Sequence, residues 1–386
     1  LDECYSDYNR CSKDNSVSDT WLHTGANNID YFKTNSLENL SINSNLKALA
    51  HIDSYPSTSF LNDNISELLK LQSYEKLKFY KKIELNKKKI SPSHMIHYRN
   101  FLEIKKYIKL NSNVLEIGSG SGILSSMIHR SFKTKNFMCD IPETLIFQKY
   151  YIKKNFKNIK TQFIANSTDK INLNNDFFFI NSSQLLRLKL DLDLVINIDS
   201  FSEMDKDTVI NYLDYSEKKL KKNGTIFLSN TIGHSKKGFH YPSEIPIPKL
   251  FKVNDLDIYY PTARDNYSKY LNIVLKKTSI RRKFNANKKL LKSFYLNSDD
   301  IIYQNSYAIY KKKFIDVFNQ YDNSKKYIKK FKPKVFKFDY SQNLNVEKLY
   351  LYLFKKIISF LKNNQIDKIK DFYSSLYKRE FKNTKL

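Results

Sequence analysis

The sequence predicts an α/β fold in which helices cover both faces of a mostly parallel sheet. One observation is the middle of the chain, residues 111–280, where short apolar runs alternate with segments of helical length. Another is a glycine-rich segment that directly follows the first of these runs. A third is size, because 386 residues with 41% hydrophobic content can bury a large core. In such a sheet the ligand lies beyond the carboxyl ends of the strands, where the strand order reverses.

Six apolar runs are predicted to be the strands of this sheet. They are residues 114–117, 137–139, 177–180, 192–198, 225–228 and 271–275. The third assignment has a rival, because residues 161–165 also have the composition of a strand. Upstream of the sheet, apolar residues at helical spacing predict a helix that contains Met95, Tyr98, Phe101 and Ile104.

The chain is predicted to have three parts: a helical and loop region over residues 1–110, the α/β core over 111–280, and a basic helical extension over 281–386. The second boundary rests on charge, since residues 281–386 carry 26 basic and nine acidic side chains, against 40 and 30 before them. Within the extension, residues 346–361 form an apolar stripe at helical spacing. A helix packed on the core is favoured, and contact with a membrane surface is the alternative.

The net charge of +27 comes mostly from 58 lysines, with only eight arginines. Nucleic-acid binding is therefore not expected, because proteins that read nucleic acid rely on the bidentate contacts of arginine. The sequence has no apolar run long enough to span a membrane and no signal peptide at its start. With three cysteines it forms no disulfide framework, so a cytoplasmic location is expected. The oligomeric state is not predicted.

A glycine loop is the first candidate functional feature. Three of the seven glycines, Gly118, Gly120 and Gly122, fall between the predicted strand 114–117 and a predicted helix that starts at residue 123. Glycines at such positions allow a tight turn and a close approach of the backbone to a ligand. The spacing differs from a dinucleotide fingerprint, because the third glycine comes one residue early. The acidic residue Glu116, two residues before the first glycine, also distinguishes this loop from a dinucleotide fingerprint.

Asp140 is the second candidate, at the end of the predicted strand 137–139 and 18 residues after Gly122. A carboxylate in this position can accept two hydrogen bonds from the vicinal hydroxyls of a ribose. The alternative is that Asp140 caps the following helix, where Pro142 falls in the first turn. Both roles can coexist.

Three segments resemble known methyltransferases. Residues 116–122 read E-I-G-S-G-S-G and resemble motif I of class I S-adenosylmethionine-dependent methyltransferases. Residues 139–145, C-D-I-P-E-T-L, followed by Q-K-Y-Y at 148–151, resemble a segment of bacterial sugar O-methyltransferases, a family associated with surface-polysaccharide biosynthesis. Residues 193–204, D-L-V-I-N-I-D-S-F-S-E-M, resemble another segment of that family. No family motif is recognised in residues 1–60 or 285–386.

The resemblance implies a Rossmann-like methyltransferase fold with a mostly parallel seven-stranded sheet. It implies S-adenosyl-L-methionine as the cofactor and a sugar or glycan as the substrate. The substrate could carry anionic groups or be linked to a lipid. The residues that would contact the cofactor are Glu116, Gly118, Ser119, Gly120, Gly122, Asp140, Ile141, Ser183, Gln184 and Asn197. Positions 183 and 184, expected beside the adenine, lack the aspartate that many relatives carry.

Transfer of a methyl group to a sugar hydroxyl calls for a general base, since a neutral hydroxyl is a weak nucleophile. The candidates are Asp199 and Glu203, after the strand 192–198, and His234 and His240, in the loop after the strand 225–228. Each also has a purely structural alternative, a surface position for the histidines and a local backbone contact for Glu203. Asp199, Glu203 and a histidine lack the spacing of a metal site, so no metal is expected.

Two other functions stay open at the level of the sequence. The charge suggests an RNA methyltransferase, but residues 197–200 read N-I-D-S instead of the N-P-P-[YF] loop that clamps a flipped base. The other alternative is a non-catalytic glycan-binding or glycosyltransferase-associated protein. Its support is the D-L-D string at 191–193, although Asp193 leads into a buried strand.

Overall fold

The computed structural model describes residues 2–11, 66–72, 83–85, 88–233, 235–259, 269–280, 288–297 and 307–320. The strands are β1 (Ile83–Leu85), β2 (Lys88–Ile90), β3 (Asn113–Ile117), β4 (Lys135–Asp140), β5 (Thr161–Ile164), β6 (Phe177–Asn181), β7 (Leu192–Ile198), β8 (Leu220–Asn230), β9 (Phe251–Tyr259) and β10 (Tyr270–Lys277). The α-helices are α1 (Asp2–Asn9), α5 (Pro92–Ile104), α6 (Ile123–Phe132), α7 (Pro142–Asn155), α8 (Lys206–Lys219), α9 (Lys288–Asn297) and α10 (Tyr307–Gln320). Short 3₁₀ turns are η2 (Lys105–Tyr107), η3 (Ser182–Arg187), η4 (Ser200–Ser202) and η5 (Pro242–Glu244).

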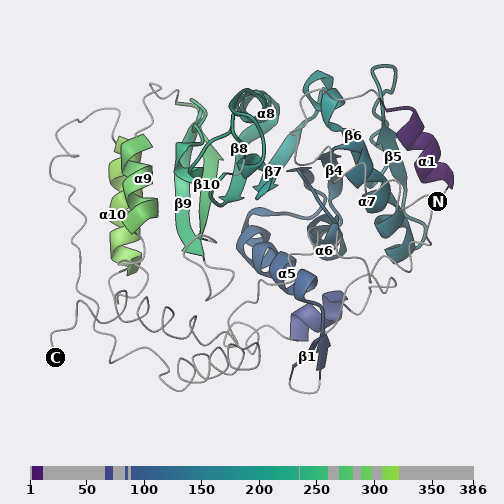
Figure 1. Cartoon of the computed structure of the whole chain (residues 1–386), viewed down its shortest axis with the longest axis horizontal. Coiled ribbons are helices and arrows are strands. Elements are labelled where there is room, and N and C mark those ends of the chain that lie inside the picture. The colour runs from purple at the N-terminus through teal and green to yellow at the C-terminus, as the bar shows by residue number, and fades with distance from the viewer. Residues whose placement is uncertain are drawn as a thin grey trace, which may run out of the picture. The chain divides into compact units, whose positions relative to one another are not determined.

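The main sheet has the strand order β5-β6-β4-β3-β7-β8-β10-β9 (Figure 1). From β5 to β8 the neighbouring strands are parallel, whereas β10 is antiparallel to both β8 and β9. The chain runs outward from β3 through β4 to the β5 edge and then returns to β7 on the other side of β3. The strand order therefore reverses between β3 and β7, and a ligand crevice is expected at the carboxyl ends of these strands.

All six predicted strands are present, and the pairing of β6 with β4 confirms 177–180 as the third strand of the parallel series. The rival segment is also a strand, β5, and it extends the sheet beyond β6. The expectation of seven strands is therefore wrong, because this sheet has eight strands within the described residues. Strand β9 was not predicted, since polar residues interrupt its sequence, F-K-V-N-D-L-D-I-Y.

Helix α5 covers one face of the sheet and confirms the helix predicted upstream of it. Its residues Met95, Tyr98 and Phe101 are each at most 1% exposed. They belong to one apolar cluster with Ile196 of β7 and Phe227 of β8. Burial of these side chains stabilises the contact by roughly 1.5–3 kcal/mol for each large apolar group. A short antiparallel hairpin of β1 and β2 precedes α5.

At the start of the chain, α1 packs on α7 through a buried lysine. The Nζ atom of Lys149 donates to Oε1 of Glu3 at 2.6 Å and also bonds to the carboxylate of Asp7. Burial by itself lowers the pKa of Lys149, but its hydrogen bonds to Asp7 and Glu3 raise the pKa above the ordinary value. The charge of this lysine is thus neutralised within the fold and does not reach the surface.

The C-terminal region begins with two described helices that pack beside the β9 edge (Figure 1). Asn319 of α10 accepts from the backbone N–H of Val253 at 3.0 Å and donates to its carbonyl at 2.8 Å. The predicted helix over 346–361 lies outside the described residues, and the division of the chain at residues 110 and 280 stays a prediction. Within the described ranges, no helix is long and apolar enough to cross a membrane.

Candidate functional site

The loop from β3 to α6 needs glycine at three positions. The backbone φ angle is 69° at Gly118, 50° at Gly120 and 76° at Gly122, all in the left-handed region that side chains disfavour. The loop is fixed at both ends, because Gly118 donates to the carbonyl of Cys139 at 2.8 Å and Gly122 donates to the carbonyl of Ser119 at 3.0 Å. The conformation explains why the sequence places its scarce glycines here.

The three glycines differ in the space around them. A Cβ atom on Gly118 would lie 2.1 Å from Oγ of Ser200, and one on Gly122 would lie 3.0 Å from Cε of Met138. A Cβ atom on Gly120 would meet nothing within 4 Å. Packing within the fold therefore restricts Gly118 most, and a Cβ atom at Gly122 would require a small shift of the Met138 side chain. Gly120 leaves room for another molecule to approach the backbone.

The carboxylate of Asp140 faces this loop. Its Oδ2 atom accepts from the backbone N–H of Gly120 at 2.9 Å and from Nε2 of Gln148 at 3.1 Å. Its Oδ1 atom accepts from the N–H of Ile141 at 2.8 Å. Burial raises the pKa of Asp140 to about 6, although these three donors oppose the shift. The cap of α7 is Ile141, so the alternative that Asp140 is itself the cap residue is wrong.

Gln148 of α7 ties the same groups together. Besides bonding to Asp140, its Nε2 atom donates to the carbonyl of Gly120 at 2.8 Å, and its Oε1 atom accepts from Oγ of Ser119 at 3.1 Å. Gln148 is fully buried and Ser119 is 3% exposed. The sequence indicated Gln148 only as part of a resemblance, and the structure places it at the centre of the loop's contacts.

Glu116 lies beneath the loop and is 4% exposed. Its Oε2 atom accepts from Oγ of Ser125, in the first turns of α6, at 2.5 Å. Burial raises the pKa of Glu116 from 4.5 to about 8, with the Ser125 hydrogen bond acting in the opposite direction. The side chain is thus mostly protonated at neutral pH, and it joins the end of β3 to the helix that follows the loop.

Asn197, near the end of β7, is buried and holds three parts of the fold together. Its Nδ2 atom donates to the carbonyl of Ile117 at 2.9 Å and to Oγ of Ser200 at 2.5 Å. Its Oδ1 atom accepts from Nδ2 of Asn230 at 3.0 Å and from the N–H of Phe201 at 3.3 Å. Asn197 therefore connects the ends of β3, β7 and β8 with the turn η4.

Asp199 follows β7 directly and has a strained backbone, with φ at 63°. Its N–H donates to the carbonyl of Ser229 at 2.7 Å, and its Oδ2 atom accepts from the hydroxyl of Tyr270 at 2.8 Å. Ser202 bonds to its carbonyl. Tyr270 was missed in the sequence because it precedes the apolar run 271–275 that indicated this strand. Aspartate is among the residues that adopt a positive φ more readily, and such strained positions also occur at functional sites.

The other candidate bases differ in exposure. Glu203 ends η4, where its N–H bonds to the carbonyl of Ser200 at 3.1 Å, and its side chain is half-buried. His240 is exposed, and the edge of its ring meets the ring of Tyr241 with centroids 4.3 Å apart. His234 lies outside the described residues. Asp199 differs from Glu203 and His240 in having a described hydrogen bond from a side chain of the same sheet, that of Tyr270 on β10.

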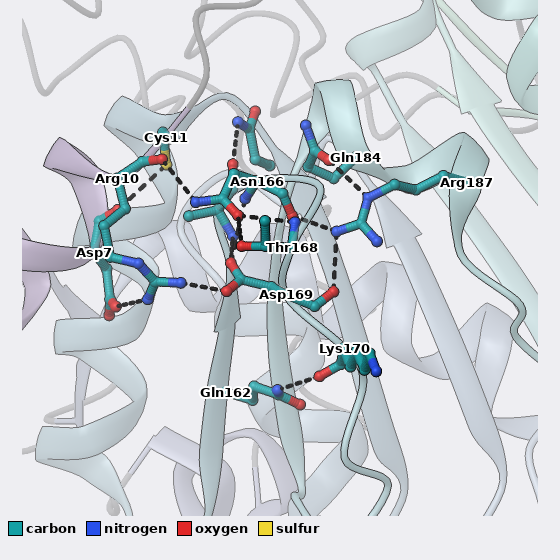
Figure 2. Close-up of polar contacts among 12 residues, drawn as sticks. Asp7, Arg10, Cys11, Gln162, Asn166, Thr168, Asp169, Lys170, Gln184 and Arg187 are labelled. Atoms are coloured by element: carbon teal, nitrogen blue, oxygen red, sulfur yellow. Dashed lines mark hydrogen bonds and ion pairs between the residues drawn. The ribbon is translucent and has the colours of Figure 1, made fainter.

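The turn after β6, η3, carries Ser183 and Gln184, the residues expected beside the adenine. Gln184 is buried, Ser183 is exposed, and Nε2 of Gln184 donates to Oγ of Ser183 at 2.8 Å. Nε of Arg187 donates to Oε1 of Gln184 at 2.7 Å (Figure 2). Arg187 also bonds to the carbonyls of Asn166 and Asp169, in the loop after β5. The turn is therefore braced by the strand that extends the sheet.

The same loop is joined to the start of the chain. Arg10, just after α1, bonds to the carboxylate of Asp169, and Nδ2 of Asn166 donates to the carbonyl of Arg10 at 3.4 Å (Figure 2). Asp169 in turn accepts from the N–H of Ala165 at 2.8 Å. These contacts connect the N-terminal helix with the β5–β6 side of the site.

The residues that the structure describes contain no group of three or more histidine, cysteine, aspartate or glutamate side chains that could hold a metal ion. The groups gathered at the carboxyl ends of β3, β4 and β7 are backbone N–H groups, carboxyl groups and neutral amides. Such donors and acceptors suit an organic ligand that carries hydroxyl or amino groups.

No family profile matches the chain, and no curated protein is similar to it in sequence. Among solved structures it is similar to a methyltransferase from Pyrococcus furiosus, with 12% identity and a TM-score of 0.34 over 57% of this chain and 99% of that one. A SAM-dependent methyltransferase from Methanosarcina mazei gives 13% identity and a TM-score of 0.33 over 46% and 97%. TrmN from Thermus thermophilus gives 11% and 0.33 over 49% of each chain. Identities and TM-scores this low carry no argument about function. The description of the fold rests on the strand order and registers given above.

Substitutions in the glycine loop should have unequal effects on stability. Gly118→Ala should lower the free energy of unfolding by about 3 kcal/mol or more, because the new methyl group overlaps the Ser200 side chain and the φ angle is positive. Gly120→Ala should cost only about 1 kcal/mol, from the φ angle alone. Urea unfolding of both variants measures the difference. Equal losses would show that the space around the two positions is not as described.

The stability of the protein should fall as pH rises through the range in which Glu116 loses its proton. Its pKa is raised from 4.5 to about 8, so the folded chain retains a proton that the unfolded chain releases. Glu116→Gln should match the wild type near about pH 4 and exceed it near about pH 9 by on the order of 4 kcal/mol.

Urea unfolding at both pH values tests this prediction. Asp207→Asn, at an exposed carboxylate of α8, is the matched control and should leave the pH dependence unchanged. A Glu116→Gln variant that is less stable than the wild type at high pH would mean that the carboxylate is ionised and needed.

Proposed function

We propose that this chain is a class I methyltransferase that uses S-adenosyl-L-methionine. The observation that carries the proposal is the hydrogen bond from the N–H of Gly120 to Oδ2 of Asp140, at 2.9 Å. It joins a glycine loop after the central strand to a carboxylate at the tip of the neighbouring strand, next to the point where the strand order reverses. The motif around Gly118–Gly122 supports the same function.

The residues around Gly120 fit the cofactor. The open space at Gly120 allows the methionine part to lie along the loop, and Asp140 is placed to accept hydrogen bonds from the ribose hydroxyls. Ile141 would lie beside the ribose, with Ser183 and Gln184 at the adenine. Glu116, Gly118, Ser119, Gly122 and Asn197 hold the loop in shape. The bound cofactor supplies an electrophilic methyl group.

The carboxylate of Asp140 must change partners to accept two ribose hydroxyls. A carboxylate has about four acceptor positions, and three are filled by Gly120, Ile141 and Gln148. Gln148 is the partner that can leave at least cost, because its amide keeps the bond to the carbonyl of Gly120 at 2.8 Å. Asp140 would then hold the loop and the ribose together.

We further propose that the methyl acceptor is a sugar hydroxyl and that Asp199 is the general base. Asp199 lies at the carboxyl end of β7, on the far side of the crevice from Asp140. The Tyr270 hydroxyl fixes one carboxylate oxygen at 2.8 Å, so the side chain is held in one orientation. Glu203, His234 and His240 are the remaining candidates for this role.

The alternative substrate is RNA, and the net charge of +27 is the observation that favours it. The alternative of a glycosyltransferase-associated protein loses its main support. Asp193, in the D-L-D string, accepts from the N–H of Asn113 at 2.8 Å and from Nζ of Lys221 at 2.9 Å. A carboxylate engaged in this way is a poor metal ligand.

The cofactor proposal predicts that the wild-type chain binds S-adenosylhomocysteine at one site in titration calorimetry. Asp140→Asn should raise the Kd by about 10-fold or more, because one charged acceptor is lost. Gly120→Arg should abolish binding, since the arginine would occupy the open space. Asp207→Asn is the control and should bind normally. A wild-type chain that binds no S-adenosylhomocysteine would refute the methyltransferase proposal.

The acceptor proposal predicts that tritium from labelled S-adenosylmethionine enters a cell-envelope glycan extract and not bulk RNA. Asp199→Asn should lower the rate of labelling by about 100-fold, through loss of the base. Its Kd for S-adenosylhomocysteine should change by less than about 3-fold, because Asp199 is not proposed to touch the cofactor.

Glu203→Gln tests the rival base in the same assay and should retain most activity. A larger loss with Glu203→Gln than with Asp199→Asn would transfer the role of base to Glu203. Labelled RNA with unlabelled glycan would replace the sugar acceptor with a nucleic acid.

A further inference from the structure

The carboxyl end of β8 and the start of β10 contain buried polar side chains that the fold does not satisfy. Ser229 is fully buried and Asn272 is 3% exposed. Oγ of Ser229, and both Oδ1 and Nδ2 of Asn272, have no hydrogen-bond partner among the groups that the structure describes. Leaving such groups unpaired costs roughly 1–3 kcal/mol each, so their presence calls for an explanation.

The two side chains lie together. Ser229 and Asn272 are directly opposite each other in the antiparallel β8–β10 pair, so their side chains point to the same face of the sheet. Ile198, at the end of β7, is the parallel partner of Ser229 on that face. The face is the one that carries Phe227 and Val274, which belong to the same apolar cluster as helix α5. The unsatisfied atoms thus form one patch.

The patch adjoins the proposed catalytic carboxylate. The carbonyl of Ser229 accepts the N–H of Asp199 at 2.7 Å. Tyr270, two residues before Asn272 on β10 and therefore on the same face, donates to the Asp199 carboxylate at 2.8 Å. Asp199 is thus linked directly to both strands that carry the unsatisfied side chains, to β8 through its backbone and to β10 through its carboxylate.

Resting on the proposed function, we infer that Ser229 and Asn272 form the acceptor subsite and bind hydroxyl groups next to the one that is methylated. An alcohol both donates and accepts a hydrogen bond, and so do the serine hydroxyl and the asparagine amide. Neither side chain is charged, so the pair suits a neutral polyhydroxyl sugar better than a phosphate. Both side chains are closed off from solvent, so binding must displace what covers them.

The inference predicts that removing these polar groups stabilises the protein while impairing turnover. Ser229→Ala and Asn272→Leu should each raise the Tm by about 2 °C or more, because an unpaired buried group is replaced by an apolar one. Labelling of the cell-envelope glycan extract should fall at least about 10-fold in each variant. The Kd for S-adenosylhomocysteine should stay within about 2-fold of the wild type.

Asn136→Leu is the matched control for the change at Asn272. Asn136 is also a buried strand asparagine, at the opposite end of the sheet, but it is paired with Thr134 and His129. Its replacement should lower the Tm, because these partners lose their hydrogen bonds.

Three results would overturn the inference. A fall in Tm with Ser229→Ala and Asn272→Leu would show that the two side chains serve the fold, and unchanged glycan labelling would show that they do not contact the acceptor. A wild-type chain that labels RNA or nothing at all would also overturn it. Binding of S-adenosylhomocysteine by the wild type then shows separately whether the methyltransferase proposal stands.

Discussion

The hydrogen bond between the N–H of Gly120 and the carboxylate of Asp140 is the contact on which the candidate site depends. It spans the ends of two adjacent parallel strands, and it forms only because Gly118, Gly120 and Gly122 turn the backbone into the left-handed region. Gln148 then bonds to both sides of this contact, so that the loop, the carboxylate and α7 form one unit. A carboxylate that binds a backbone N–H of the loop is held in place before any ligand arrives, which reduces the ordering cost of binding.

The sequence was sufficient for the centre of the sheet because β3, β4, β6 and β7 are largely buried on both faces and read as apolar runs. It failed at the edges. Strand β9 alternates polar and apolar residues, with Val253 buried and Asn254 exposed, and β5 has only four residues. An edge strand needs to bury only one face, so its sequence signal is weaker.

For the site, the sequence predicted residue types that chemistry demands, namely the three glycines and Asp140. It did not predict connectors such as Tyr270, whose role depends on a neighbour 71 residues away in the chain. It grouped Asn197 with the cofactor contacts, which stays a prediction, and it did not predict the four bonds that this buried amide makes inside the fold. Spacing in the sequence shows which strand end a residue occupies, but it does not show which way the side chain points.

A positive φ angle and unpaired polar atoms occur together where β7 and β8 end and β10 begins. Asp199 has a positive φ angle, and Ser229 and Asn272 beside it have polar atoms without partners. At the other end of the sheet, Asn136 is equally buried and is paired with Thr134. The fold can therefore satisfy a buried asparagine where nothing else is required of it. The unsatisfied end is the end where a ligand is expected, and departures from good packing of this kind are typical of functional sites.

The positive charge of the chain does not determine the character of this site. Two carboxyl groups contact the glycine loop and the first turns of α6, Asp140 and Glu116, and Nε2 of His97 lies 3.3 Å from Oγ of Ser121 in the same loop. Burial raises the pKa of both carboxyls, to about 6 and about 8. Both carboxyls are thus poised to lose protons near neutral pH. A nearby positive charge lowers the pKa of a carboxyl group, so a cationic ligand in this loop would be bound with release of protons. A phosphate would have the opposite effect and would be repelled as each carboxyl ionises. The two buried carboxyls therefore make the loop a poor site for a pyrophosphate, which agrees with the glycine spacing.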